Sequence, residues 1–328
     1  MTLVRGEDIA LGVAIETTPG TFVAAQDYVR SRDPHSIQTI VEKATIRETK
    51  LTGAASHGDV VVMKKVEGDI PLNLRFRTIG YFLKSLLGGL ASATEAGETI
   101  VYRHTITLNS AVTQPTLSLS HSRGAHTHRQ IPGAVVTKMG LSFPIDDLIN
   151  GSVSIKGLTE TDTSNFTPSF NTGDHFAPHH MVTLKIASAV AGLAGATAIN
   201  ITDLAIEMDR GSREKVALSS TSPLGFIAAL LSISGSFKMD KDDETYRALA
   251  VANTARAMEI KIRNIDQLIG VAAYPELTIT LPNVSLETSE ERTIDDTVTE
   301  EVKFVAHYDD TQAKAITMSL VNLKATYV

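Results

Sequence analysis

Histidines are the residues of this sequence best placed to do chemistry, because they gather in two short segments. The segments HSRGAHTHRQ and DHFAPHH hold His121, His126, His128, His175, His179 and His180. A His-x-His pair on a strand can chelate zinc. However, no acidic ligand stands at a suitable spacing, Arg123 and Arg129 would repel a cation, and both segments have the composition of loops. We therefore expect solvated or interface histidines and no metal site.

Other catalytic signatures are missing from the sequence. The chain has no cysteine, which excludes disulfides, thiolate metal sites and a cysteine nucleophile together. It also lacks the G-x-S-x-G, Walker, H-E-x-x-H and dinucleotide-binding patterns. The sequence thus predicts a protein that is not an enzyme, with no catalytic residue and no cofactor.

Composition limits the possible partners. A chain of 328 residues with 43% apolar content can form one large or two ordinary domains. The net charge of -7 disfavours a surface that binds nucleic acid through its phosphates. Arg5, Glu7 and Asp8 precede any apolar run, unlike a signal peptide, and no uncharged apolar stretch reaches the roughly 18 residues of a membrane helix. We expect no cleaved leader, no membrane span and no specific nucleic-acid binding.

Alternation of apolar and polar residues covers most of the chain, which is typical of half-buried strands. Examples are DVVVMKKVEGDIPLNL, ALLSISGSFKMD and EEVKFVAHY. Helical spacing is convincing only over about 75–87 and 244–252. The sequence therefore predicts a mainly antiparallel β protein with two short helices. One polar face on each long strand is ordinary for an antiparallel sheet, but strands joined across subunits could instead line a water-filled lumen.

The order of elements occurs twice along the chain. Gly68 in VEGDIPLNL and Gly235 in ISGSFKMD each lie in a strand that is followed at once by a helix, about half the chain apart. A glycine inside a strand often marks a bend or a close approach. The repetition predicts two tandem units. We expect an N-terminal arm over 1–34, unit one over 35–165, a linker over 166–198 and unit two over 199–328.

The N-terminal segment IALGVAIETTPGT resembles the opening of the major tail tube proteins of long, non-contractile-tailed (siphovirus-type) bacteriophages. The strand VEGDIPL and a helix ending LLGG follow in the same order. The pattern G-x-x-x-E-T-T-P-G-T consists of Gly12, Glu16, Thr17, Thr18, Pro19, Gly20 and Thr21. The resemblance implies two tandem tail-tube-like β-sandwich or barrel units, each with a short flanking α-helix, whose long strands join neighbours into a closed inner β-barrel.

The resemblance also implies a structural function. Such proteins form rings that stack into the tail tube, a conduit for DNA ejection into the host. Members with one unit per chain usually form hexameric rings, so two units per chain imply a homotrimeric, pseudo-hexameric ring. Ring closure removes exposed sheet edges. The implied partners are further copies of the chain, the tape measure protein and later viral DNA in the lumen, and tail terminator and baseplate or distal tail proteins at the ends. The implied location is the virion tail, assembled in the host cytoplasm.

Two sets of residues follow from this interpretation. Exposed carboxylates in the lumen would repel DNA phosphates and keep the genome from binding. The expected lumen-facing residues are Lys65, Glu67, Asp69, Asn73, Ser234, Ser236, Lys238 and Asp240. The N-terminal arm and the loops 50–59 and 209–225 are expected to reach the next ring. The expected contacts between rings are Glu16, Pro19, Gly20, Lys50, His57, Arg210, Arg213 and Glu214.

A second class of function stays open at this point. The chain could be a non-polymerising β-sandwich binding module, such as a tail decoration or an adhesin-like protein. The two embedded helices and the N-terminus without an export signal favour the tube. Purified protein would form rings or tubes in the first case and dispersed particles in the second.

Overall fold

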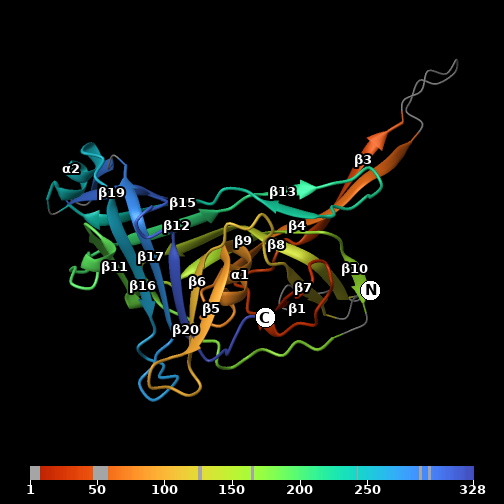
Figure 1. Cartoon of the computed structure of the whole chain (residues 1–328), viewed down its shortest axis with the longest axis horizontal. Helices are drawn as coiled ribbons and strands as arrows, with labels where there is room; N and C mark the ends of the chain where they lie inside the picture. Colours follow the sequence, from red (N-terminus) through yellow and green to blue (C-terminus); the bar gives the residue numbers. More distant parts are fainter. Residues whose placement is uncertain are drawn as a thin grey trace.

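Antiparallel strands make up most of the computed structural model of this protein (Figure 1). The structure describes residues 8–46, 58–124, 128–163, 166–241, 243–287, 290–294 and 297–328. The prediction of a mainly β protein is confirmed, and the two helices, α1 (Ile79–Leu87) and α2 (Thr245–Val251), lie within the two predicted helical segments. The first helix begins later than predicted, at Ile79, because 76–78 forms a turn before it.

The remaining elements are strands and two short 3-10 turns. In chain order they are β1 (Ile9–Ile15), β2 (Asp27–Val29), β3 (Gln38–Thr45), β4 (Asp59–Asn73), β5 (Gly88–Thr94), β6 (Tyr102–Leu108), β7 (Leu117–Arg123), β8 (His128–Phe143), β9 (Asn150–Gly157), β10 (Thr161–Thr163), η2 (His179–Met181), β11 (Val182–Ala187), η3 (Val190–Gly192), β12 (Asp203–Asp209), β13 (Ser212–Lys215), β14 (Gly225–Ala228), β15 (Ser232–Asp240), β16 (Arg256–Arg263), β17 (Glu276–Leu286), β18 (Glu290–Ile294), β19 (Thr297–His307) and β20 (Thr317–Asn322).

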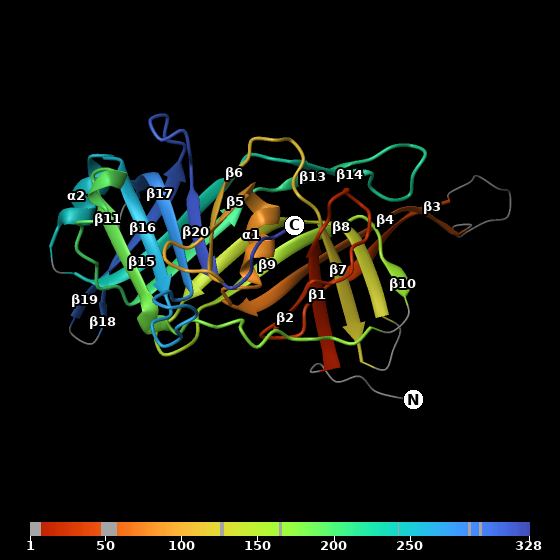
Figure 2. The same ribbon diagram turned by 60° about the horizontal axis from the view of Figure 1, so that its bottom comes forward.

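One long sheet runs through the molecule from β3 to β18, which lie at opposite ends in Figure 2. Its order is β3-β4-β9-β8-β12-β15-β19-β18, and every neighbouring pair is antiparallel. The end of β17 joins the same sheet beside β19. The chain therefore contributes a continuous run of strands from both halves of its sequence.

Two flanking sheets pack on the long sheet, and each shares one bent strand with it. The first has the order β2-β1-β7-β8-β10 and uses the first half of β8. The second has the order β11-β16-β17-β20-β6-β5 and uses β17 from Glu276 to Val284. The strands β1 and β2 lie in the segment expected to be an N-terminal arm, and β11 lies in the expected linker.

The two helices differ in burial. In α1, eight of nine residues are buried, and Ile79, Leu83 and Leu86 lie in the core together with Phe76 from the preceding turn. In α2 no residue is fully buried, although Tyr246 and Leu249 pack against the same hydrophobic cluster. That cluster extends through both halves of the chain, so apolar burial, the main driving force of folding, is shared between them.

Both strand glycines lie where a side chain would not fit. A Cβ atom on Gly68 would lie 2.5 Å from the Cα atom of Ile37. A Cβ atom on Gly235 would lie 2.3 Å from the carbonyl oxygen of Ala205 and 2.5 Å from the ring of Phe304. The expectation that these glycines mark close packing is confirmed.

The segment after β1 is a turn held by the buried carboxylate of Glu16. Pro19 and Gly20 occupy the central positions of a turn in which the Thr21 amide donates to the Thr18 carbonyl at 3.0 Å, and the φ of +80° at Gly20 suits glycine. Glu16 is only 6% exposed. Its placement corrects the expectation that Glu16 contacts the next ring.

Each oxygen of this carboxylate accepts two hydrogen bonds of 2.7 Å. Oε1 accepts from the Ser118 hydroxyl and the Gly133 amide, and Oε2 accepts from the Thr116 hydroxyl and the Gly20 amide. Glu16 therefore joins the turn to β7 and β8, so the E-T-T-P-G stretch has a structural role within the subunit.

Two of the histidines expected to be solvated or at an interface, His121 and His128, are buried instead, whereas His175 and His179 are partly exposed and His180 is exposed. His121 on β7 and His128 on β8 are 4% and 3% exposed, because β7 and β8 lie inside the flanking sheet. The centroid of the His121 ring lies 4.4 Å from that of His35, itself 8% exposed. Burial and the charge of Arg123 lower the pKa of His35 to about 4, and burial with neighbouring cationic groups lowers the pKa of His121 to about 3. His126 lies outside the described residues.

Replacement of Glu16 should destabilise the subunit. Glu16→Gln keeps one acceptor oxygen but places an amide group opposite a backbone N–H donor, so we expect a loss of about 2 kcal/mol in the free energy of unfolding; Glu16→Ala should cost about 3 kcal/mol. Urea denaturation of the subunit measures both values. Thr17→Ala, at the exposed neighbouring position, is the control and should change stability by less than about 0.5 kcal/mol. Equal stability of all three variants would contradict this role.

Acid should destabilise the fold through His35 and His121. Both pKa values in the folded state lie below the unfolded value of about 6.5, so below that pH the unfolded chain binds more protons than the folded chain. Stability should be unaffected above pH 6.5 and should fall by about 3 kcal/mol for each histidine, or about 6 kcal/mol together, as the pH drops toward 4. Melting temperatures across this range test the effect. The double variant His35→Leu, His121→Leu should show a clearly weaker decline, and an unchanged decline would assign it to other groups.

Candidate functional site: the polar face of the long sheet

Polar side chains form rows that cross the long sheet from strand to strand. Directly opposite residues of antiparallel strands lie on the same face. One such row consists of Asp69, Ser154, Lys138, Asp209 and Ser232 on β4, β9, β8, β12 and β15. A parallel row consists of Asn73, Asn150, Ser142, Ala205, Ser236 and Lys303 and extends to β19. The rows belong to strands from both halves of the sequence.

The eight residues predicted to face a lumen lie on this one face, which we call the polar face. Lys65, Glu67, Asp69 and Asn73 alternate along β4 with the buried Val66, Ile70 and Leu72. Ser234, Ser236, Lys238 and Asp240 alternate along β15 with the buried Ile233, Phe237 and Met239. The opposite face packs against the core, so the strands have one dry and one wet side.

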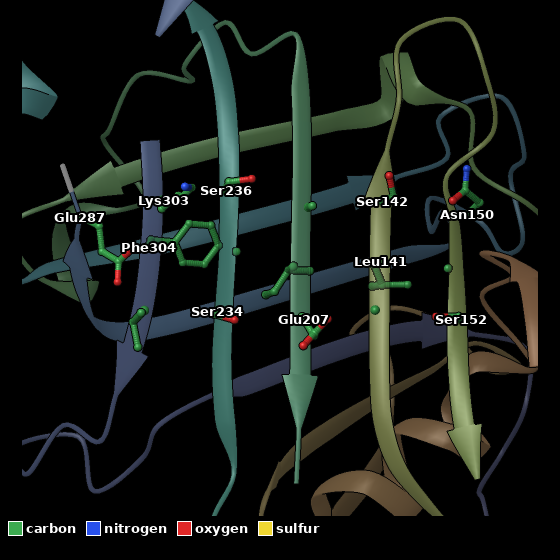
Figure 3. Close-up of a pocket in the computed structure, with 16 residues that line it drawn as sticks. Leu141, Ser142, Asn150, Ser152, Glu207, Ser234, Ser236, Glu287, Lys303 and Phe304 are labelled. Atoms are coloured by element: carbon green, nitrogen blue, oxygen red, sulfur yellow. The ribbon is translucent and has the colours of Figure 1, made fainter. Parts of the chain in front are cut away.

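The polar face contains separate hollows. Figure 3 shows the first of them, where Ser142, Glu207 and Ser234 project from neighbouring strands. Its volume is about 570 Å³, and its lining comes from β8, β9, β12, β15 and β19 with Glu287. A second hollow lies over β4 and β9, where Glu67, Asp69 and Lys156 line it. The lining of the first hollow combines serine hydroxyls and charged groups with apolar groups such as Leu141 and Phe304.

Carboxylates outnumber lysines on the polar face. By strand register, its described charged residues are Glu42, Glu67, Asp69, Asp203, Glu207, Asp209, Asp240, Glu287 and Glu301, with Lys65, Lys138, Lys156, Lys238 and Lys303.

The lysines of this face are held by carboxylates. Lys138 and Glu207 form an ion pair of 2.9 Å, and Lys238 and Asp203 form another of 2.9 Å. A hydrogen bond from Lys138 to Glu207 raises the pKa of this lysine.

Lys65 has three acidic neighbours. It lies 3.2 Å from Glu214 and 3.3 Å from both Glu42 and Glu67. Although partial burial opposes the shift, these carboxylates raise the pKa of Lys65. The ammonium groups are therefore charged and already paired, and the balance of the face is negative.

The residues expected to contact the next ring are distributed differently. Arg210 is 3% exposed, and its guanidinium donates to the carbonyl oxygens of Leu86 at 2.7 Å and Asn109 at 2.8 Å. Arg210 thus satisfies a free carbonyl at the end of α1, which corrects the expectation that it lies on the surface. Glu214 pairs with Lys65 and Lys156 of the same chain.

The other residues of that set are at least partly exposed or lie outside the described residues. Pro19 and Arg213 are exposed and Gly20 is partly exposed. Lys50 and His57 lie outside the described residues.

Two hairpin arms leave the body of the molecule with apolar side chains in solvent (Figure 1). On the β3–β4 arm, Val41, Val60 and Val62 are 41%, 51% and 46% exposed. On and beside the β13–β14 arm, Leu218 and Leu230 are 111% and 92% exposed. For Leu218, the sequence signal was an apolar residue inside the polar segment KVALSSTSPLG.

Within the described ranges, no group of three or more histidine or acidic side chains is arranged to hold a metal ion. In that same part of the chain, no helix is long and apolar enough to cross a membrane.

Comparison with known families gives an independent result. Residues 6–306 match the family model described as phage tail tube protein, which covers nearly the whole chain. A comparison with curated proteins found no significant match. The resemblance carried by the N-terminal motif and the strand-helix order is therefore confirmed, and the matched family is a structural one and not a family of enzymes. This chain belongs to the phage tail tube protein family.

Proposed function

We propose that this protein polymerises into stacked rings that form a tail tube, and that the polar face of the long sheet lines the channel through which DNA leaves the virion. The observation that carries the proposal is the continuity of polar rows across strands of both halves of the chain, with the opposite face packed in the core. A surface that continues from strand to strand can continue from chain to chain.

The pairing pattern supports two tandem tube units. In the first half, β4 lies between β3 and β9 and is followed by α1; in the second half, β15 lies between β12 and β19 and is followed by α2. The strands β8 and β17 each bend from a flanking sheet into the long sheet. With two such units in one chain, three chains supply the six units of a tube ring.

The resulting channel is wide enough for duplex DNA. Each chain contributes eight strands when the end of β17 and β18 are taken as one. Strands lie about 4.8 Å apart and tilt by about 40° in barrels, so about 24 strands give a circumference of about 150 Å and a channel of about 35 Å inside the side chains. Barrels of roughly 16 to 18 strands already enclose water.

The charge pattern of the polar face suits a conduit. DNA binds to proteins mainly through lysine and arginine contacts that displace counterions from phosphates. The lysines Lys65, Lys138, Lys156 and Lys238 are paired with carboxylates, and further carboxylates such as Asp69 and Asp240 give the face a negative balance. Such a wall repels phosphates, so DNA passes without sticking.

The remaining partners follow from the same proposal. The tape measure protein fills the lumen before DNA does, and tail terminator and baseplate or distal tail proteins close the two ends of a tube assembled in the host cytoplasm. Pro19, Gly20 and Arg213, together with Lys50 and His57, stay the candidates for contacts between rings. The exposed apolar arms and open sheet edges favour this polymer over a binding module that stays dispersed.

Purified protein should form rings or tubes. Negative-stain images at increasing protein concentration should show rings, and averaged top views should show three strong and three weaker repeats, because the two units of a chain differ in sequence. Dispersed particles at every concentration would contradict a self-assembling tube, and six equal repeats would contradict the three-chain ring.

Charge reversal on the polar face should slow DNA ejection. Asp69→Lys combined with Asp240→Lys places unpaired cations in the proposed lumen, so we expect tails of normal length and ejection slowed several-fold, with the delay relieved at high salt. Fluorescence of released DNA measures the rate. Asp310→Lys, in an exposed turn between β19 and β20, is the matched control and should eject normally. Normal ejection by the double variant in intact tails would show that this face does not line the channel.

A further inference from the structure

The pairing of β8 with β12 inside the chain provides a template for the contact between chains. We infer that the strand edge formed by Glu287 and β18 of one copy pairs with β3 of the next copy, in the register that β8 and β12 have within each chain. This inference rests on the proposed ring and specifies its joint: which edges meet, in which direction and opposite which residues.

The template is an antiparallel joint between the two halves of the chain. After Val136, β8 leaves its flanking sheet, and its free side then pairs with β12 from Lys138 opposite Asp209 to Phe143 opposite Leu204. In the long sheet, the outermost strand of the first half, β8, therefore pairs with the outermost strand of the second half, β12.

The second half repeats the strand that provides this edge. Leu286 on β17 lies opposite Phe304 as Val136 on β8 lies opposite Ile155. The Glu287 amide then donates to the Lys303 carbonyl at 2.8 Å, and β18 continues the strand beside β19. Among the described strands, none pairs with the other side of β18.

The receiving strand β12 also has a counterpart, which is β3 in the first half of the chain. β3 lies beside β4 as β12 lies beside β15. None of the described strands pairs with the other side of β3, which stands at the far end of the sheet from β18 (Figure 2). The two edges of the long sheet are therefore complementary: β18 corresponds to the end of β8, and β3 corresponds to β12, the two strands that already pair within the chain.

The register between chains follows from residues that correspond in the two halves. Ile155 on β9 corresponds to Phe304 on β19, and the next paired positions are Lys138 opposite Ser154 in the first half and Glu287 opposite Lys303 in the second. Glu287 therefore takes the place of Lys138.

On the receiving side, Asp209 lies opposite Ser232, three residues before Gly235. Ile40 lies opposite Lys65, three residues before Gly68. Ile40 of the next copy therefore takes the place of Asp209 and lies opposite Glu287.

The arms add a second contact to the template. Within the chain, the segment after β13 reaches β4, where the Lys64 amide donates to the Thr221 carbonyl at 2.7 Å and Glu214 pairs with Lys65 at 3.2 Å. Because β15 corresponds to β4, the equivalent contact between chains would place the β3–β4 arm of the next copy at the start of β15. Leu230, just before β15, is 92% exposed, and the arm has exposed valines to cover it.

An open edge of this kind needs a partner. β3 has no proline and is largely exposed, and such an edge pairs with other chains unless it is covered. Closure of the ring by a second and third copy covers both edges with the same hydrogen-bond pattern that the chain already uses.

Paired cysteines test the joint directly, since the chain has none of its own. The variant Ile40→Cys, Glu287→Cys is assembled, oxidised or treated with a short bis-maleimide, and run on a denaturing gel without reductant. We expect covalent dimers and trimers, with the ladder ending at three because the third bond closes the ring. The matched control is Lys138→Cys, Asp209→Cys, whose bond forms within one chain and leaves a monomer without free thiols.

The outcomes separate this inference from the proposed function. Rings or tubes in which the control pair closes but the Ile40 and Glu287 pair stays uncrosslinked would overturn the joint and leave the tube intact. A ladder that extends to six would support the joint and overturn the three-chain ring. If the variant and the native chain form no rings at all, both the joint and the tube are wrong. Each single-cysteine variant alone should give no ladder, and a ladder from either would also overturn the register.

Discussion

Hydrogen bonding between neighbouring strands is the constraint on which the rest of this structure depends. Each strand of the long sheet must find partners on both sides, and the chain satisfies this from β4 to β19 by pairing the strands of each half with one another and joining the two halves at β8 and β12. Only the outer sides of β3 and β18 lack a partner among the described strands. Polymerisation is then the continuation of sheet formation, because the same hydrogen bonds that fold the chain can join one chain to the next.

The pleat of the sheet connects folding with the proposed conduit. Because side chains alternate between faces, the apolar residues that hold the core also fix which polar residues lie together on the other side. Val66 and Ile70 face the core, so Glu67 and Asp69 face away from it. Carboxylates on neighbouring strands pair with lysines such as Lys138, so the net charge of this face is negative.

Buried backbone N–H and C=O groups need hydrogen-bond partners, and this need explains why two residues expected at the surface have structural roles. Glu16 and Arg210 are ordinary surface residue types, and both stand in segments with turn composition. In the fold each satisfies several backbone groups that would otherwise be buried without a partner. The histidines on β7 and β8 are buried for a related reason, since the segment that holds them is sheet and not loop. None of these outcomes has a local signature.

Local features can be read from the amino-acid sequence: the alternation that makes strands, the two helical segments, the N-terminal motif of the family, and the glycines at Gly68 and Gly235 that allow close packing. The alternation also places the eight polar residues on one side of each of two strands. That these two sides belong to one sheet, with Asp69 and Ser232 in the same row, and that β3 and β18 are its free edges, is visible only in the folded chain. The reason is physical: side-chain alternation depends on residues two apart, whereas strand pairing depends on hydrogen bonds between segments far apart in the chain.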